Sequence, residues 1–119
     1  MTTETLSPVV TEFLDEIFRG YPYSTDTRVT STDTRVTMFS SPTIDLEFHN
    51  DRETGHLLEV ALYGYHTYRG DGGSLNIIIT PEGKLVKMKT DGYWILTSTK
   101  VGKMFTKMVR EVSAASRLA

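Results

Sequence analysis

Hydrophobic side chains near the N-terminus recur at the spacing of one helix face. Ser7 can cap the start of a helix, Pro8 suits its first turn, and Gly20 suits its end. The pattern therefore predicts an amphipathic helix with an acidic outer face. Its apolar positions are Leu6, Val9, Val10, Phe13, Leu14, Ile17 and Phe18.

From residue 41 onward the pattern changes to the alternation of antiparallel strands with one wet face. Apolar residues occupy every second position from Ile44 to Phe48, and a turn is expected at Asn50–Gly55. Further turns are expected at Pro81–Gly83 and Asp91–Gly92, the second joining strands over 84–90 and 93–97. A long strand after the Asn50–Gly55 turn has as its expected inward residues Leu58, Val60, Leu62, Gly64, His66 and Tyr68, and the next strand is expected over Leu75–Thr80.

Two identical heptads stand side by side, Ser24–Thr30 and Ser31–Thr37. Seven is odd, so one continuous strand would place Val29 and Val36 on opposite faces. We therefore expect a hairpin that turns near residues 31 and 32, or one copy in a strand and the other outside it.

The duplication has two interpretations. In the first, it is an insertion tolerated by a surface loop, and deleting the second heptad leaves a folded protein. In the second, Arg28 and Arg35 are presented together on a paired Thr/Arg surface.

A second amphipathic pattern follows residue 100, and Ser98 or Thr99 is its expected cap. We predict one α+β domain over residues 1–119: an N-terminal helix, an antiparallel meander of five to six strands, and a C-terminal helix. Both helices would cover one face of the sheet. The alternative is a half-open barrel around the C-terminal helix. The apolar positions of that helix are Val101, Met104, Phe105, Met108, Val109 and Val112.

Composition narrows the possible chemistry. Hydrophobic residues make up 39% of the chain and charged residues 24%, as in ordinary globular proteins. The chain has no cysteine, which rules out disulfides, thiolate metal sites and a cysteine nucleophile. The start of the chain lacks a basic region, and no apolar run approaches membrane-spanning length. We therefore expect a cytoplasmic protein with no membrane association and no cofactor.

Charge is divided along the chain. Residues 1–83 carry five basic and thirteen acidic side chains, and residues 84–119 carry eight basic and two acidic ones. The net charges are −8 and +6, hidden within a total of −2. Such asymmetry concerns partners rather than fold.

The basic residues of the last helix, Lys100, Lys103, Lys107 and Arg110, are spaced along one side. They are candidate contacts for an acidic protein surface or a small anionic ligand. Arg69, Arg28 and Arg35 are further candidates. Nucleic acid is not expected, because the isoelectric point is about 5.9 and aromatic residues do not alternate with basic ones.

Tyr63 and Tyr65 fall on the outer face of the long strand, where amphipathic aromatic residues favour an interface. We expect a homodimer or higher oligomer through this face, with Ile78 and Leu85 also on it.

Three further groups are weaker candidates. His49 and His56 flank one turn with Asp51 and Glu53 nearby, but their spacing is loose and no metal site is predicted. The loop Gly70–Gly73 is rich in free amide groups next to Arg69, but it matches no phosphate-binding template. Acid–base chemistry in a pocket would use His66 and Tyr68.

These patterns predict a non-enzymatic binding or inhibitor protein. Small domains of this type occur among phage and mobile-element proteins that antagonise host machinery, and this comparison rests on size and composition, not on particular residues. The alternatives are a virion or assembly component, in which the −8 and +6 regions meet between subunits, and a small enzyme using His66 and Tyr68.

Overall fold

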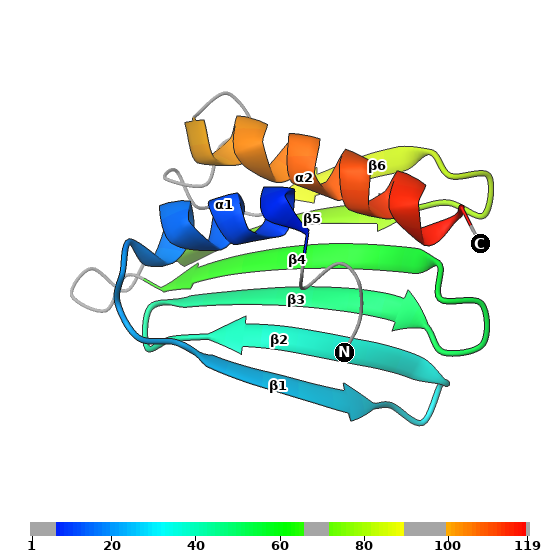
Figure 1. Cartoon of the computed structure of the whole chain (residues 1–119), viewed down its shortest axis with the longest axis horizontal. Coiled ribbons are helices and arrows are strands. Elements are labelled where there is room, and N and C mark those ends of the chain that lie inside the picture. Colours follow the sequence, from blue (N-terminus) through cyan, green and yellow to red (C-terminus); the bar gives the residue numbers. More distant parts are fainter. Residues whose placement is uncertain (1–6, 66–71, 90–99, 119) are drawn as a thin grey trace.

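The computed structural model describes residues 7–65, 72–89 and 100–118. Within them a helix, six strands and a second helix follow one another along the chain (Figure 1). The strands form one antiparallel sheet in chain order, so that β1 and β6 are the outermost of the described strands. This open sheet confirms the predicted α+β fold and not the barrel alternative. The elements are α1 (Pro8–Phe18), β1 (Ser24–Val29), β2 (Thr34–Ser40), β3 (Ile44–Asp51), β4 (Leu57–Tyr65), β5 (Gly72–Ile79), β6 (Leu85–Lys89) and α2 (Lys100–Ser116).

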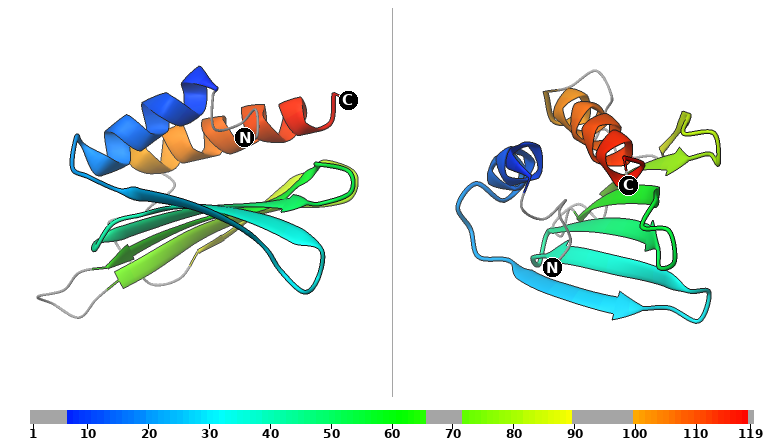
Figure 2. Two further views of the ribbon diagram at one scale, coloured as in Figure 1. Left: turned by 60° about the horizontal axis from the view of Figure 1, so that its bottom comes forward. Right: turned by 45° about the vertical axis from the view of Figure 1, so that its right-hand side comes forward.

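Both helices lie on the same face of the sheet, as predicted (Figure 2). Helix α2 contacts β4 and β5, and Phe13 of α1 packs against Phe105 of α2 with ring centroids 5.6 Å apart. Removing these side chains from water is the main favourable term in folding. The core cluster contains Val10, Phe13, Leu14, Ile17, Phe18, Phe39, Leu46, Phe48, Leu57, Val60, Leu62, Leu75, Ile77, Ile79, Phe105, Met108, Val109 and Val112.

Helix α1 begins after Ser7 and ends just before Gly20, as its sequence predicts, but the Ser7 side chain does not cap it. Ser7 is the N-cap, but its side chain makes no capping hydrogen bond; its carbonyl oxygen accepts from the Val10 and Thr11 N–H groups. At the other end Arg19 is left-handed, with φ of 51°, and Gly20 follows with φ of 82°. A non-glycine residue in this region carries a conformational cost of about 1–2 kcal/mol.

A bulge near the start of β4 changes which of its residues point toward the helices. His49 pairs with Glu59 whereas Asn50 pairs with Leu57, so Leu58 is an extra residue in the ladder. Such a bulge reverses the face of every residue before it. Leu57 is consequently 0% exposed, while Leu58 is 37% exposed on the other face. The prediction that Leu58 points inward is wrong.

The repeated heptads form the β1–β2 hairpin, which confirms the predicted turn. The Thr30 hydroxyl accepts hydrogen bonds from the Thr32 and Thr34 N–H groups, and Asp33 adopts a left-handed φ of 61°. These contacts hold the second copy at the start of β2. The first copy supplies the whole of the edge strand.

Equivalent residues of the two copies nevertheless face opposite sides of the sheet. Arg28 pairs with Val36, and Val29 pairs with Arg35. Val36 is 3% exposed and Val29 is 50% exposed. Since directly opposed residues share a face, Arg28 and Arg35 lie on different faces. The interpretation that they form one paired surface is therefore wrong.

The end of α2 is tied to the turn between β5 and β6. The Arg117 guanidinium donates to the carbonyl oxygens of Thr80 and Pro81 at 3.0 and 3.1 Å. Gly83 lies against the Arg117 side chain with φ of 88°, which confirms the tight turn predicted here. Arg117 thus acts structurally and is not part of a free basic surface.

Some predictions concern residues outside the described ranges. They are the strand over 93–97, its Asp91–Gly92 hairpin, and a cap at Ser98 or Thr99. Within the described part of the chain, neither helix has the length and apolar character needed to cross a membrane.

Candidate functional site

The four predicted cations of the last helix lie together on the solvent side of α2. All four side chains are exposed, while Phe105, Met108 and Val109 on the opposite side enter the core. We refer to the set as the α2 basic face. It consists of Lys100, Lys103, Lys107 and Arg110.

One of these cations is already paired. The Lys100 Nζ atom lies 3.2 Å from Glu16 Oε1 of α1. For Lys103, Lys107 and Arg110, no carboxylate of the described residues comes within 4.0 Å. Within residues 7–65, 72–89 and 100–118, these three exposed charges therefore have no carboxylate partner.

The two other predicted arginines that the structure describes do not join this face. Arg28 is on edge strand β1, on the sheet face away from the helices, since it pairs with Val36. Arg35 is on the helix side of β2. Strand β2 lies two strands, about 10 Å, from β4, the nearest strand that α2 contacts. Arg69 lies outside the described residues.

The sheet face opposite the helices has no helix over it among the described elements (Figure 2). Tyr63 is on this face, half-buried, as predicted. The register of Tyr65 places it on the same face, but its side chain lies outside what is described. Ile78 is exposed there, whereas Leu85 packs against the core on the helix side, so the prediction for Leu85 is wrong.

Three carboxylates gather on β3 and β4 in the middle of this open face. Asp45 pairs with Tyr63, and Glu47 and Glu59 follow on the same face of β3 and β4. Partial burial raises the pKa of the Tyr63 phenol, and the charges of Glu47, Glu59 and Asp45 raise it further. Glu47 Oε1 lies 2.9 Å from His49 Nε2, and Asn76 donates to Glu59 at 2.8 Å. We refer to Asp45, Glu47 and Glu59 as the acidic row.

Apolar side chains lie on both sides of the acidic row. The register places Val36 and Met38 on β2 at one side. On the other side are Ile78 of β5 and Val86 and Met88 of β6, all exposed. The open face therefore combines negative charge with apolar area, as partner-binding surfaces often do.

The two histidines near the β3–β4 turn do not form a metal centre with their neighbours. His49 contacts Glu47, and the Asp51 carboxylate accepts from the Thr54 hydroxyl and N–H, which lowers its pKa. Over residues 7–65, 72–89 and 100–118, no group of three or more His, Asp or Glu side chains is placed to hold a metal ion. His66, Tyr68 and Gly70–Asp71 lie outside these ranges.

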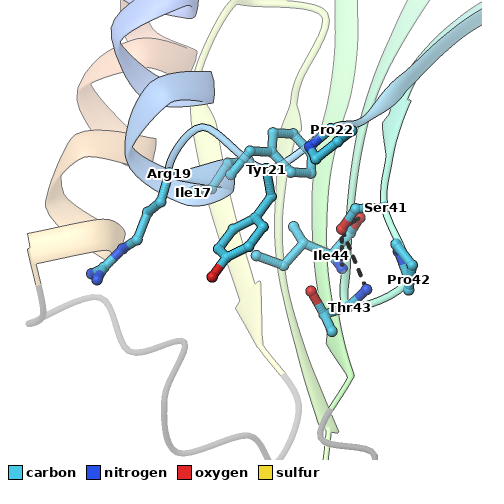
Figure 3. Close-up of a pocket in the computed structure, with 9 residues that line it drawn as sticks. Ile17, Arg19, Tyr21, Pro22, Ser41, Pro42, Thr43 and Ile44 are labelled. Atoms are coloured by element: carbon cyan, nitrogen blue, oxygen red, sulfur yellow. Dashed lines mark hydrogen bonds between the residues drawn. The ribbon is translucent and has the colours of Figure 1, made fainter.

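A pocket lies at the end of α1, against the turn between β2 and β3 (Figure 3). Its volume is about 630 Å³. In the sheet beside it, Ile44 of β3 pairs with Gly64, which pairs with Gly73. Because both partners of Ile44 in this line across the sheet are glycines, β4 and β5 place no side chain there on the helix side. The pocket is lined by Ile17, Phe18, Arg19, Tyr21, Pro22, Ser41, Pro42, Thr43 and Ile44.

Neither the acidic row nor the pocket was predicted from the sequence as a site. The alternation in β3 and β4 already put Asp45, Glu47 and Glu59 on one face, so that row had a detectable signal. The pocket depends on how α1 is placed over the sheet, which no local pattern specifies. Comparison with protein families, characterised proteins and solved structures finds no match to this chain.

Proposed function

We propose that this is a non-enzymatic binding protein that occupies an acidic surface of another protein through the α2 basic face. The observation that supports this is the exposure of Lys103, Lys107 and Arg110 without carboxylate partners among the described residues. Exposed charges of one sign steer an oppositely charged partner and contribute specificity.

The spacing of these cations favours an extended partner over a small anion. Lys103 and Arg110 are seven residues apart, which is about 10 Å along a helix. Neither the pocket at the end of α1 nor the cavity near His49 and His56 is lined by them. Charges spread along a convex helix match several carboxylates of a protein surface, whereas a small anion needs donors that converge.

Charge reversal tests this proposal. Poly-L-glutamate serves as the acidic probe, and fluorescence anisotropy at low ionic strength reports its binding. The double variant Lys103→Glu/Lys107→Glu is expected to bind at least about tenfold more weakly, since each reversal replaces an attraction of up to about 1 kcal/mol by repulsion. Its melting temperature should stay close to that of the parent protein.

A matched control separates position from net charge. Lys84 and Lys87 are also exposed, but they belong to the β5–β6 turn and β6. Reversing both changes the net charge by the same amount and should leave binding within about twofold, because they are not part of the α2 basic face. Equal losses in the two variants would contradict the proposal, since binding would then follow total charge alone.

Head-to-tail assembly is a second candidate function, favoured by the acidic row. The chain carries its own negative surface around Tyr63, on the sheet face opposite the helices. If the α2 basic face of one copy docks on the acidic row of the next, the contact is heterologous and builds rings or filaments. We expect association that grows with protein concentration and weakens with salt.

Mixing two reversed proteins tests this assembly. Sedimentation velocity should show that Lys103→Glu/Lys107→Glu and Glu47→Lys/Glu59→Lys each fail to associate alone. An equimolar mixture should associate again, because the acidic helix of one meets the basic sheet face of the other. A parent protein that stays monomeric at all concentrations, or variants that associate as it does, would contradict head-to-tail assembly.

A further inference from the structure

We infer that the pocket at the end of α1 binds a small organic anion with an apolar body, whose charged group meets Arg19. This goes beyond the proposed function, because the pocket and the α2 basic face share no residue. At about 630 Å³ the pocket is within the range of roughly 300–1,000 Å³ that holds small organic ligands.

Apolar residues from two separate elements line the interior. Ile17 and Phe18 come from the last turn of α1, and Ile44 begins β3. Pro22 of the segment after α1 and Pro42 of the β2–β3 turn add to the apolar lining (Figure 3). A ligand entering here gains mainly by removing hydrocarbon from water.

Arg19 gives the pocket a positive charge at its mouth. Its guanidinium is 3.9 Å from Glu16, but that carboxylate lies closer to Lys100, at 3.2 Å. Glu16 is thus shared between two cations, and Arg19 has the longer of the two contacts. The side chain of Arg19 is 77% exposed and so is free to contact a ligand.

Tyr21 adds an aromatic rim with a polar tip. Its N–H donates to the Phe18 carbonyl oxygen at 2.9 Å, which fixes the linker after α1. The ring is 74% exposed, and its hydroxyl lies between Arg19 and Thr43 in Figure 3. An exposed aromatic ring with a polar tip is suited to a ligand that is apolar at one end and charged at the other.

The opposite wall is held in place by its own hydrogen bonds. The Ser41 hydroxyl oxygen accepts from the N–H groups of Thr43 and Ile44 at 3.3 and 3.2 Å, and the Ser41 N–H donates to the Ile44 carbonyl oxygen at 2.9 Å. A preformed wall lowers the ordering cost of binding.

Three probes separate the two parts of the ligand. Octanoate has both the chain and the charge, octanol has only the chain, and acetate has only the charge. Backbone amide NMR should show saturable octanoate shifts at residues 17–21, 41, 43 and 44, where the pocket lies. Octanol should bind about tenfold more weakly, since it lacks a charge-assisted hydrogen bond, and acetate should cause no saturable shift.

Two variants and a control complete the test. Arg19→Asn keeps a residue that tolerates the left-handed backbone, and should reduce octanoate affinity to that of octanol while octanol binding is unchanged. Thr43→Trp, at an exposed rim position, should block both ligands. Lys103→Asn removes a cation from α2 and should have no effect on either.

The results that overturn the inference are equally specific. Octanoate shifts that centre outside these residues, or equal octanoate affinity in Arg19→Asn and the parent protein, would remove the assigned site. Failure here leaves the α2 basic face intact as a proposal, because its probe is poly-L-glutamate and its variants are different ones.

Discussion

Leu57→Asp is expected to yield a protein that does not fold, whereas Leu58→Asp is expected to yield a folded one. Leu57 is 0% exposed, belongs to the core cluster, and donates its N–H to the Ser116 hydroxyl. The substitution removes a buried leucine side chain and places an unpaired carboxylate away from water. Together these two effects cost more than about 4 kcal/mol. That cost is a large fraction of the roughly 5–15 kcal/mol that stabilises a domain.

The neighbouring leucine is the matched control, since it has the same residue type in the same strand. Leu58 is 37% exposed on the open face, so its replacement should cost about 1 kcal/mol or less. Far-ultraviolet circular dichroism and urea unfolding measure both variants. Equal stability of the two variants, or a folded Leu57→Asp protein, would show that the bulge between His49 and Asn50 is misplaced.

Val36→Ala is expected to lower the free energy of unfolding by about 2 kcal/mol, and Val29→Ala by less than about 0.5 kcal/mol. The two valines have identical neighbours within their heptads. Val36 is 3% exposed between Arg28 and His49, and it loses about two buried methyl groups. Val29 is 50% exposed on a strand whose residues are all exposed, so little burial is lost.

Urea unfolding of the two alanine variants in parallel measures this difference directly. Because the local sequence is the same, helix or strand propensity and the unfolded chain contribute almost equally to both. The difference therefore reports tertiary environment alone. Similar losses would mean that the two copies occupy equivalent positions, contrary to the hairpin register.

The sequence pattern correctly predicted the elements whose periodicity is long and regular. Both helices and the alternation of β3 follow from one apolar face meeting one core, which a single repeat length encodes. The phase at Leu58 was missed because a bulge depends on the pairing of two strands, not on either strand alone. The same reason explains Leu85, whose face is set by its partner Ile79.

The candidate site that the sequence correctly placed belongs to one element. The α2 basic face arises from spacing on a single helix, and its exposure was confirmed. The prediction that Arg28 and Arg35 lie together was wrong because the hairpin register pairs Arg28 with Val36. Arg35 is the neighbour of Val36 in β2, so its side chain points to the other face of the sheet. The pocket joins α1 to the β2–β3 turn across the fold, so no local pattern contains it.

The identity of the two heptads has a consequence for shortened forms of the chain. Removing Ser24–Thr30 or Ser31–Thr37 gives one and the same polypeptide, in which the remaining copy precedes Met38 and Phe39 directly. Phe39 belongs to the core and fixes that copy next to β3. Whichever heptad is removed from the gene, the strand that the folded protein loses is therefore β1, at the edge of the sheet.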